Sequence, residues 1–273
     1  MRAKSILGKE MNIVELKEVS FAYDGPLVID GLSFVAKAGE FLGVIGPNGS
    51  GKTTLLRLLS RVIRPRSGEV LLSGERIGRL SQREVARMVA VVPQETAVYF
   101  PFTAREVVLM GRSPHLGPFE IEGPRDLETC EKAMALTDTL HLADRIIVEL
   151  SGGEKRRVII ARALAQEPRI LLLDECATFL DIRHKLEIFE IVKRLNQEQG
   201  LTVISVEHDL NMAARYAQRL LLLHQGRAFA LGSPQEVITV KNIQEVFKAI
   251  VSIVQEERTR APQIFPVGLS ETT

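Results

Sequence analysis

Short, continuous runs of apolar residues recur along the chain and predict strands that are buried on both faces. These runs span residues 41–45, 89–92, 170–173, 202–206 and 220–223. Helical stretches alternate with many of the runs, and this alternation is typical of an α/β fold with a largely parallel sheet. Residues 13–23 and 32–35 instead alternate apolar and polar positions, which predicts antiparallel strands near the start of the chain.

The buried-strand runs disappear between residues 94 and 151. This interval instead predicts helices at 103–112, opened by a capping box of Thr103 and Glu106, and at 125–137. We therefore expect a helical subdomain at 95–150, inserted into a core formed by 12–94 and 151–250. Residues 251–273 are expected to form a C-terminal tail, loosely held from residue 259 onward.

The segment LSGGE, residues 150–154, precedes the helical run KRRVIIARALAQ. Ser151 and Glu154 have the spacing of a capping box. Such a cap does not need the two glycines between them, and each glycine lowers helix stability through backbone entropy. A helix start without side chains suits the close approach of a phosphate. The same cap spacing at 81–84 and 233–236 lacks the glycine pair and indicates plain caps.

The segment GPNGSGKT, residues 46–53, lies between a buried strand run and the helical run LLRLLSRVI, and it fits the pattern G-x-x-x-x-G-K-[ST]. Glycines let backbone amides curl around phosphates, and the helix start adds the positive end of its dipole. Lys52 would bring a charge to the β- and γ-phosphate oxygens, and the Thr53 hydroxyl would ligate Mg²⁺. The candidate nucleotide-binding residues are Gly46, Pro47, Asn48, Gly49, Ser50, Gly51, Lys52, Thr53 and Thr54.

Two carboxylates end the buried run RILLLDE, residues 169–175. Ligands of α/β folds bind at the carboxyl ends of strands, so Asp174 suits the coordination sphere of Mg²⁺. Glu175 is placed to take a proton from an attacking water. Acidic residues also end strands and cap helices for structural reasons, but the neighbouring phosphate loop favours the functional interpretation.

Composition and charge narrow the classes of protein. The 273 residues are 45% hydrophobic and 25% charged, which is typical of a globular protein with an ample core. The formal net charge of +1 argues against a nucleic-acid partner. Cys130 and Cys176 lie in unrelated contexts and predict neither a disulfide framework nor a metal site. No apolar run approaches the ~20 residues that span a bilayer, and MRAKSILGKEM does not resemble a signal peptide.

Taken together, GPNGSGKTT, VVPQ, LSGGE, ILLLDE, FLD and EHD resemble, in order and spacing, the motifs of an ATP-binding cassette (ABC) ATPase. The resemblance runs from about residue 12 to 240, and no guanine-reading N/T-K-x-D segment of a GTPase is found. It implies an α/β fold: a P-loop NTPase (RecA-like) core with an antiparallel β subdomain and an inserted α-helical subdomain. It also implies ATP and Mg²⁺ as cofactors.

The resemblance assigns roles to further residues. Tyr23 would stack on adenine, and Gln94 would sense Mg²⁺ and the attacking water while linking the core to the helical insert. His208 would hold the γ-phosphate and the catalytic water. Each has a structural alternative when taken alone: strand packing for Tyr23, a surface amide for Gln94 and a helix cap for His208.

The family pattern also implies a homodimer. Ser151, Gly152 and Gly153 would contact the γ-phosphate of a nucleotide held by another subunit, and Asp181 would lie in the loop that crosses between subunits. The family usually has Pro-Thr after the catalytic glutamate, where this chain has Cys176 and Ala177. That departure puts the loop toward Asp181 in question. Glu154 replaces the commoner glutamine, which is a frequent variant.

The stretches GRSPH (111–115), 179–195 and 207–239, with APQIFP (261–266), resemble the subfamily that serves iron-siderophore, haem and cobalamin uptake. This implies a bacterial importer ATPase, cytoplasmic and peripheral on the inner membrane. Its partners would be transmembrane permease subunits and, in the full system, a substrate-binding protein. The alternative is a soluble ABC ATPase of a protein or Fe–S assembly complex. Tyr99, Phe100 and Phe102 are either core of the insert or part of a groove for a permease helix.

Overall fold

A six-stranded sheet runs through the centre of the molecule. The computed structural model describes residues 11–94 and 100–269. In spatial order the strands are β10 (Arg227–Gly232), β9 (Arg219–His224), β3 (Phe41–Ile45), β8 (Thr202–Val206), β7 (Ile170–Asp174) and β6 (Val89–Val92). All neighbours except β10 and β9 pair in parallel. The predicted buried strands and the parallel sheet are therefore confirmed.

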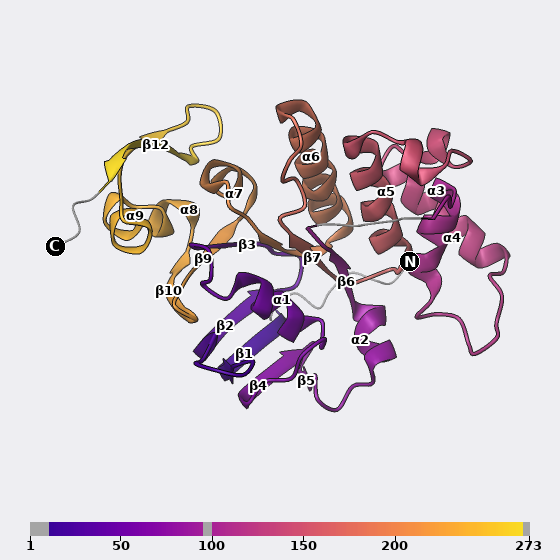
Figure 1. Ribbon diagram of the computed structural model, residues 1–273, viewed down its shortest axis with the longest axis horizontal. Coiled ribbons are helices and arrows are strands. Elements are labelled where there is room, and N and C mark those ends of the chain that lie inside the picture. Colours follow the sequence, from indigo (N-terminus) through magenta and orange to yellow (C-terminus); the bar gives the residue numbers. More distant parts are fainter. Residues whose placement is uncertain (1–10, 95–99, 270–273) are drawn as a thin grey trace, which may run out of the picture.

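A second, four-stranded antiparallel sheet covers one face of this sheet (Figure 1). It consists of β2 (Ile29–Lys37), β1 (Asn12–Phe21), β4 (Ser67–Leu72) and β5 (Glu75–Arg76). Helix α1 (Lys52–Leu59) buries its leucines in a core shared with strands of both sheets, and α2 (Gln82–Met88) leads into β6. The predicted antiparallel strands β1 and β2 are confirmed, whereas β4 and β5 were not predicted.

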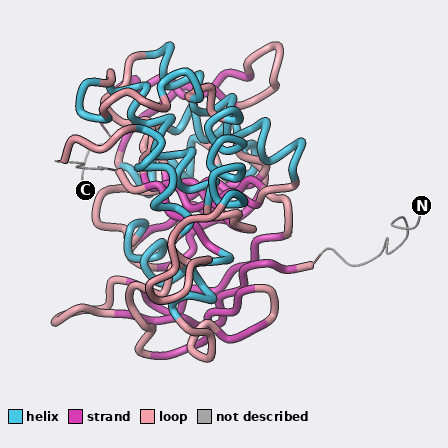
Figure 2. Tube along the Cα trace, turned by 90° about the vertical axis from the view of Figure 1, so that its right-hand side faces the viewer, coloured by secondary structure: helices cyan, strands magenta, loops and turns pink. Residues whose placement is uncertain are grey.

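Helices cover the opposite face of the six-stranded sheet, as Figure 2 shows. These are α5 (Gly152–Ala165), α6 (Ile182–Gln199) and α7 (Leu210–Tyr216). The interval 95–150 contributes α3 (Ala104–Leu109), α4 (Pro124–Leu136) and the 3₁₀ turns η1 (Met110–Arg112), η2 (Leu140–Leu142) and η3 (Ile147–Glu149). Helices α3 and α4 pack on α5 at one end of the molecule. The division of the chain at 94 and 151 stays a prediction.

The predicted helix starts are confirmed in detail. Thr103 and Glu106 form a complete capping box at α3, as Ser151 and Glu154 do at α5. The boxes at 81–84 and 233–236 start α2 and α8 (Pro234–Val237), which are short helices without a glycine pair. A serine or threonine followed three residues later by glutamate therefore marks a helix start four times within residues 11–94 and 100–269.

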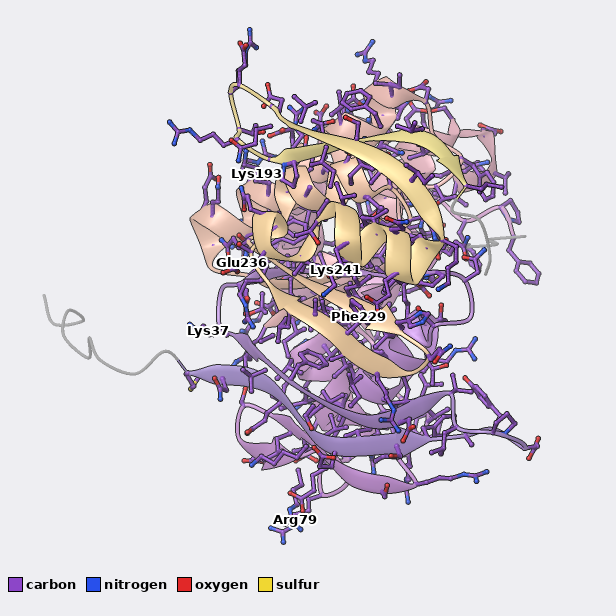
Figure 3. All side chains as sticks on the ribbon, turned by 90° about the vertical axis from the view of Figure 1, so that its left-hand side faces the viewer. Lys37, Arg79, Lys193, Phe229, Glu236 and Lys241 are labelled. Carbon is purple, nitrogen blue, oxygen red and sulfur yellow. The ribbon has the colours of Figure 1, made fainter. Side chains whose placement is uncertain are left out.

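The expectation of a C-terminal tail is wrong for the part of it that the structure describes. After α9 (Val240–Phe247), strands β11 (Ala249–Gln255) and β12 (Pro262–Leu269) form an antiparallel hairpin. Figure 3 shows it at the end opposite Arg79 of the antiparallel-sheet region. The backbone of Ile264 exchanges two hydrogen bonds with the Asn211 side chain of α7. Val251 and Ile264 are buried, and this contact holds the hairpin on the core.

A buried arginine fastens the helical insert to α5. Arg112 is only 3% exposed, and its guanidinium donates to the Asp126 carboxylate at 2.8 Å, to Glu167 at 2.8 Å and to the carbonyl oxygen of Ala165 at 2.6 Å. The hydrogen bond from Arg112 is the largest of the causes that lower the pKa of Asp126. One side chain therefore joins η1, the first turn of α4 and the end of α5.

We expect Arg112→Ala to destabilise the protein strongly. Removing the buried guanidinium leaves the Asp126 carboxylate, whose side chain is 15% exposed, and the carbonyl oxygen of Ala165 without their donor, which costs about 1–3 kcal/mol. Arg125→Ala, an exposed position in the same helix turn as Asp126, should change stability by less than about 0.5 kcal/mol. Chemical denaturation followed by circular dichroism measures both. Equal midpoints for the two variants would contradict the anchoring role of Arg112.

Candidate nucleotide-binding site

The loop at residues 46–53 joins the end of β3 to the start of α1. Its backbone takes left-handed conformations at Gly46 (φ 154°) and Gly51 (φ 104°). A Cβ on Gly46 would lie 2.1 Å from the carbonyl oxygen of Leu223, and one on Gly51 would lie 2.9 Å from that of Val28. Larger residues are therefore excluded at both positions by backbone geometry and by contact with neighbouring backbone.

The side chain of Lys52 folds back into the phosphate loop and donates to its backbone. Its ammonium group donates to the carbonyl oxygens of Gly46 at 2.8 Å and Pro47 at 3.0 Å, and the residue is only 5% exposed. Burial lowers the pKa of Lys52, while the nearby carboxylates of Glu175 and Asp174 partly offset this effect. A cation that is poorly solvated and fixed within a curl of backbone is well placed to bind phosphate oxygens.

Asp174, the last residue of β7, has the properties of a metal ligand. Its Oδ1 atom is buried, and no described residue offers it a hydrogen bond. Burial and the neighbouring Glu175 raise the pKa of Asp174, and a hydrogen bond with the Thr53 side chain opposes this shift. An unpartnered buried carboxylate oxygen beside a hydroxyl fits the oxygen-ligand preference of Mg²⁺. Among the described residues, no group of three or more His, Cys, Asp or Glu side chains is arranged to hold a metal ion.

The side chains of Glu175 and His208 are in contact at the carboxyl edge of the six-stranded sheet. The Nε2 atom of His208 lies 2.5 Å from Oε1 of Glu175, whose residue is 7% exposed. Both residues line a cavity of about 370 Å³ together with Gln94 and the phosphate loop. The cavity is lined by Val28, Asn48, Gly49, Gly51, Lys52, Thr53, Thr54, Gln94, Glu175 and His208. The structure thus brings the predicted base, the predicted histidine and the predicted glutamine together with the loop.

Tyr23 lies beside this cavity rather than in its lining. Its ring packs edge-on against Phe21, with centroids 4.9 Å apart, and 43% of the residue is exposed. Burial opposes ionisation of Tyr23, but hydrogen bonds with Thr54 and Arg57 outweigh it and lower the pKa. These contacts tie the exposed ring to the first turns of α1. Tyr23 therefore packs against Phe21 at the end of β1, and part of its ring also remains exposed to a ligand.

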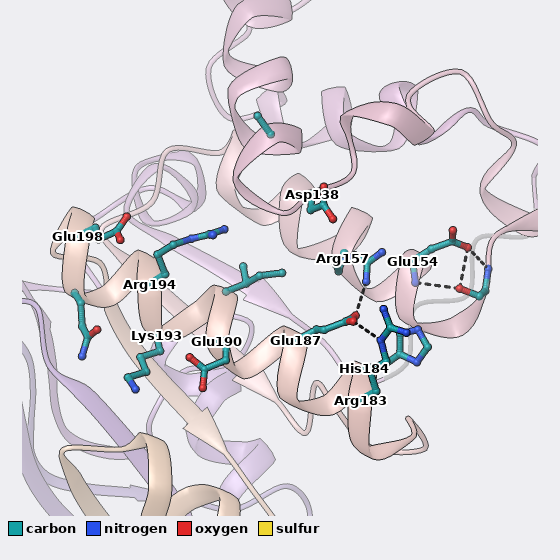
Figure 4. Close-up of a pocket in the computed structure, with 14 residues that line it drawn as sticks. Asp138, Glu154, Arg157, Arg183, His184, Glu187, Glu190, Lys193, Arg194 and Glu198 are labelled. Carbon is teal, nitrogen blue, oxygen red and sulfur yellow. Dashed lines mark hydrogen bonds and ion pairs between the residues drawn. The ribbon is translucent and has the colours of Figure 1, made fainter. Parts of the chain in front are cut away.

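The glycine-lined start of α5 lies in a different part of the surface. Ser151 does not line the phosphate-loop cavity, and it borders instead a hollow of about 910 Å³ between α4, α5 and α6 (Figure 4). Charged side chains of both signs line that hollow, among them Arg157, Arg194 and Glu187. Within one chain, the predicted signature residues and the phosphate loop are separate sites.

His184 gives Gly153 a role that the sequence analysis missed. A Cβ on Gly153 would lie 2.1 Å from Cδ2 of the His184 ring, whereas one on Gly152 would have ordinary contacts. Asp181, the N-cap of α6, accepts from the backbone N–H of His184 at 2.9 Å and contacts its Nδ1 at 2.9 Å. The hydrogen bond from the backbone of His184 is the main cause that lowers the pKa of Asp181. The signature and the Asp181 loop are therefore packed together through His184.

Cys176 and Ala177, which depart from the family pattern, are core residues. Cys176 is fully buried and Ala177 is 2% exposed. Burial raises the pKa of the Cys176 thiol. The chain turns at Glu175, which has a positive φ of 48°, and a hydrogen bond of 3.1 Å joins its carbonyl oxygen to the backbone N–H of Thr178. Two small apolar side chains thus fill the core beneath the turn.

Phe100 and Phe102 are not core residues of the insert. Phe100 is 66% exposed and Phe102 is 36% exposed, with ring centroids 6.0 Å apart. The core interpretation is therefore wrong for these two rings, which leaves the alternative of an exposed aromatic surface. Tyr99 lies outside the described residues.

The fold and the site define an ATP-binding P-loop ATPase: a lysine-closed phosphate loop, an acidic strand end and a histidine meet at the edge of a parallel sheet. A family model for the ABC transporter matches residues 29–178, and the chain belongs to this family. ATP hydrolysis is the activity of the family's cassette. The predicted P-loop NTPase fold with its antiparallel β subdomain is thereby confirmed.

Relatives match nearly the whole chain. It is 39% identical over 252 residues to the ferric enterobactin transport ATP-binding protein FepC of Escherichia coli K12, covering 92% of this chain and 93% of that protein. It is 42% identical over 249 residues to the hemin import ATP-binding protein HmuV of Myxococcus xanthus, covering 89% and 92%. The cobalamin import ATP-binding protein BtuD of Halobacterium salinarum is 39% identical over 243 residues, with coverage of 89% and 61%.

Solved structures agree with this assignment. A chain of an inward-facing ABC transporter superposes with a TM-score of 0.82 at 28% identity, covering 94% of this chain and 98% of that chain. A dimeric ATP-binding cassette bound to ADP and phosphate gives a TM-score of 0.70 at 30% identity, covering 81% and 98%. In the described part of this chain, no helix combines the length and the apolar character required to cross a membrane.

We expect Gly153→Ala to destabilise the protein because its methyl group would collide with the His184 ring. Alanine at a helical position is otherwise favoured over glycine by about 1 kcal/mol. The sign should therefore reverse in a His184→Ala background, where Gly153→Ala should raise the melting temperature. Gly152→Ala, which has only ordinary contacts, is the matched control. A destabilising Gly153→Ala in both backgrounds would show that His184 is not the cause.

Proposed function

We propose that the chain is the ATP-hydrolysing subunit of a bacterial importer that takes up an iron chelate, haem or cobalamin across the inner membrane. The observation that carries this proposal is the match, over nearly the whole chain, to ATP-binding proteins of enterobactin, hemin and cobalamin transport. The cavity described above would hold the ATPase site that such a subunit requires. The alternative of an assembly ATPase without a permease has no support among these relatives.

ATP would bind with its phosphates on residues 46–54 and its adenine against the exposed ring of Tyr23. Thr53 and Asp174, with Gln94, would hold Mg²⁺, which neutralises charge on the phosphates when it is bound. The support for the metal is the unpartnered Oδ1 of Asp174 and its contact with Thr53. The ammonium group of Lys52 would bind the phosphate oxygens.

Glu175 would act as the general base for the attacking water. Its carboxylate lies in the same cavity as Lys52 and Gln94, and the Nε2 atom of His208 lies 2.5 Å from it. In this arrangement His208 would orient the carboxylate and hold the γ-phosphate and the catalytic water, and Gln94 would contact the same water. A general base contributes about 10²–10⁴-fold to the rate.

Two chains would work as a head-to-tail homodimer with two composite sites. Ser151, Gly152 and Gly153 would reach the γ-phosphate on the partner, with Asp181 in the loop between subunits. The support is that the signature helix start borders a hollow apart from the phosphate loop of its own chain. A second helix dipole and the Ser151 hydroxyl would add the charge stabilisation that phosphoryl transfer needs. A related cassette is dimeric with ADP and phosphate bound.

Mixing two inactive variants tests this geometry. Lys52→Ala and Ser151→Arg chains should each lack ATP hydrolysis, but a mixed dimer with composite sites has one site with both lesions and one with neither. We expect an equal mixture to regain at most about a quarter of wild-type turnover, since half of the dimers are mixed and one of their two sites is intact. Exchange of subunits is monitored by fluorescence transfer. Confirmed exchange without recovered turnover or a closed ATP-bound dimer would contradict composite sites.

The permease partner would dock near the start of the helical insert. Phe100 and Phe102 lie six and eight residues after Gln94 and form an exposed aromatic pair. Helix α3 begins two residues after Phe102. A groove beside such a pair suits a short helix of a membrane partner. Docking there would place the chain peripherally on the cytoplasmic face of the membrane, and a substrate-binding protein would complete the system.

We expect Phe100→Ala and Phe102→Ala to spare basal ATPase activity while reducing uptake severalfold in cells that lack the native chain. Uptake is measured with a ferric siderophore, haem and cobalamin in turn, and Lys52→Ala should abolish whichever uptake the wild type restores. Phe265→Ala, an exposed aromatic on β12, is the control and should transport normally. Normal uptake in both insert variants would refute the docking surface, and uptake that survives Lys52→Ala would refute the importer function.

A further inference from the structure

A second buried carboxyl group, Glu207, lies behind the Glu175–His208 pair. Glu207 is 6% exposed and directly follows β8. Its backbone N–H donates to the carbonyl oxygen of Val44, and the backbone N–H of Glu175 donates to that of Val206, each at 3.0 Å. The strand pairing thus sets Glu207 beside the Glu175 turn and immediately before His208.

Among the described groups that act on this carboxyl group, the one cation is already paired with another carboxylate. Its hydrogen-bond partner is the fully buried Ser205, whose Oγ lies 2.5 Å from Oε1. The titratable groups that face it are Lys185 of α6, Asp209 at the start of α7, Glu175 after β7 and the Cys176 thiol. The ammonium of Lys185 is already 3.0 Å from the Asp209 carboxylate.

These surroundings favour the neutral acid. Burial raises the pKa of Glu207 to about 8, although Ser205 and Lys185 oppose the shift. The carboxyl therefore carries a proton near neutral pH. Above pH 8 it releases this proton to solvent, and a negative charge appears in the buried surroundings of Glu207.

We propose that Glu207 is a positioning residue of the ATPase site, which supports Glu175 and His208 as a neutral acid and slows hydrolysis when it ionises. This inference rests on the proposed role of Glu175 as the base. The transition state of phosphoryl transfer spreads negative charge over the equatorial oxygens, and the site stabilises it with positive charge and dipoles. An additional buried anion nearby opposes that stabilisation, so the rate falls as Glu207 loses its proton.

The pH dependence of kcat tests the proposal. At saturating Mg²⁺-ATP, wild-type kcat should fall about tenfold between pH 7 and pH 9, with an apparent pKa near 8. Glu207→Gln keeps an acceptor for Ser205 but cannot ionise, so its profile should stay flat over this range. Ser205→Ala removes a hydrogen bond that lowers the pKa of Glu207, so its alkaline limb should move to higher pH. Glu40→Gln, a buried glutamate paired with Arg219 outside the site, should keep the wild-type limb.

Stability supplies an independent readout. The pKa of Glu207 is higher in the folded chain than its ordinary value of 4.5, so its contribution to stability is full below pH 4.5 and is lost as pH rises to about 8. The melting temperature of Glu207→Gln should therefore exceed that of the wild type by a margin that grows between pH 5 and pH 8. A constant margin would show that Glu207 does not titrate there and would overturn the proposal.

The outcomes separate this inference from the proposed function. If Glu175→Gln abolishes turnover but Glu207→Gln retains the alkaline limb, Glu207 has no such role while the base assignment stands. If Glu175→Gln turns over normally, the base assignment itself fails, and the inference fails with it. A flat profile in Glu207→Gln, a shifted limb in Ser205→Ala and an inactive Glu175→Gln together support both.

Discussion

The parallel pairing of three buried strands, β3, β7 and β8, determines where the phosphate loop, the acidic pair and His208 lie. Their ladders align Val44 with Val206 and Asp174 with Val206, so the three carboxyl ends meet at one edge. The phosphate loop, the acidic pair and His208 all follow within a few residues of these ends. All residues of β3 and β8 are buried, and the hydrophobic effect thereby fixes polar groups that could not hold this arrangement alone.

Helix α5 connects this edge of the sheet to the helical insert. Arg156 of α5 donates to the carbonyl oxygens of Pro93, at 2.6 Å, and of Gln94. The same helix begins at the signature glycines and is held at its other end by Arg112. A displacement of α5 at the signature would therefore act on the backbone of Gln94 through Arg156. This is the physical path by which a partner at the insert and a nucleotide at the sheet edge would influence each other.

Features that depend on contacts between residues close in sequence, or on continuous burial, could be predicted from the sequence. Features that depend on contacts between distant residues could not. The strands at 41–45 and 202–206 were predictable because each is buried along its whole length, and the capping boxes because they join residues three apart. The hairpin β11–β12 was not, because most of its residues are exposed and it contains Pro266 and Gly268. The contact of Gly153 with His184 joins residues far apart in sequence, and the burial of Glu207 depends on surrounding helices. Neither leaves a local pattern.

The pKa shifts divide the carboxylates of the chain into two groups. Hydrogen bonds at the helix caps lower the pKa of exposed glutamates such as Glu106 and Glu154, and these side chains support their helices as anions. In the site, burial instead raises the pKa of the Asp174 carboxyl group. Burial also lowers the pKa of the neighbouring Lys52, so it disfavours the charged form of both side chains. Phosphate oxygens favour protonated Lys52, and a divalent cation favours ionised Asp174. Ligands that supply both charges therefore relieve two unfavourable burials at once, and their binding should stabilise the folded cassette through linkage.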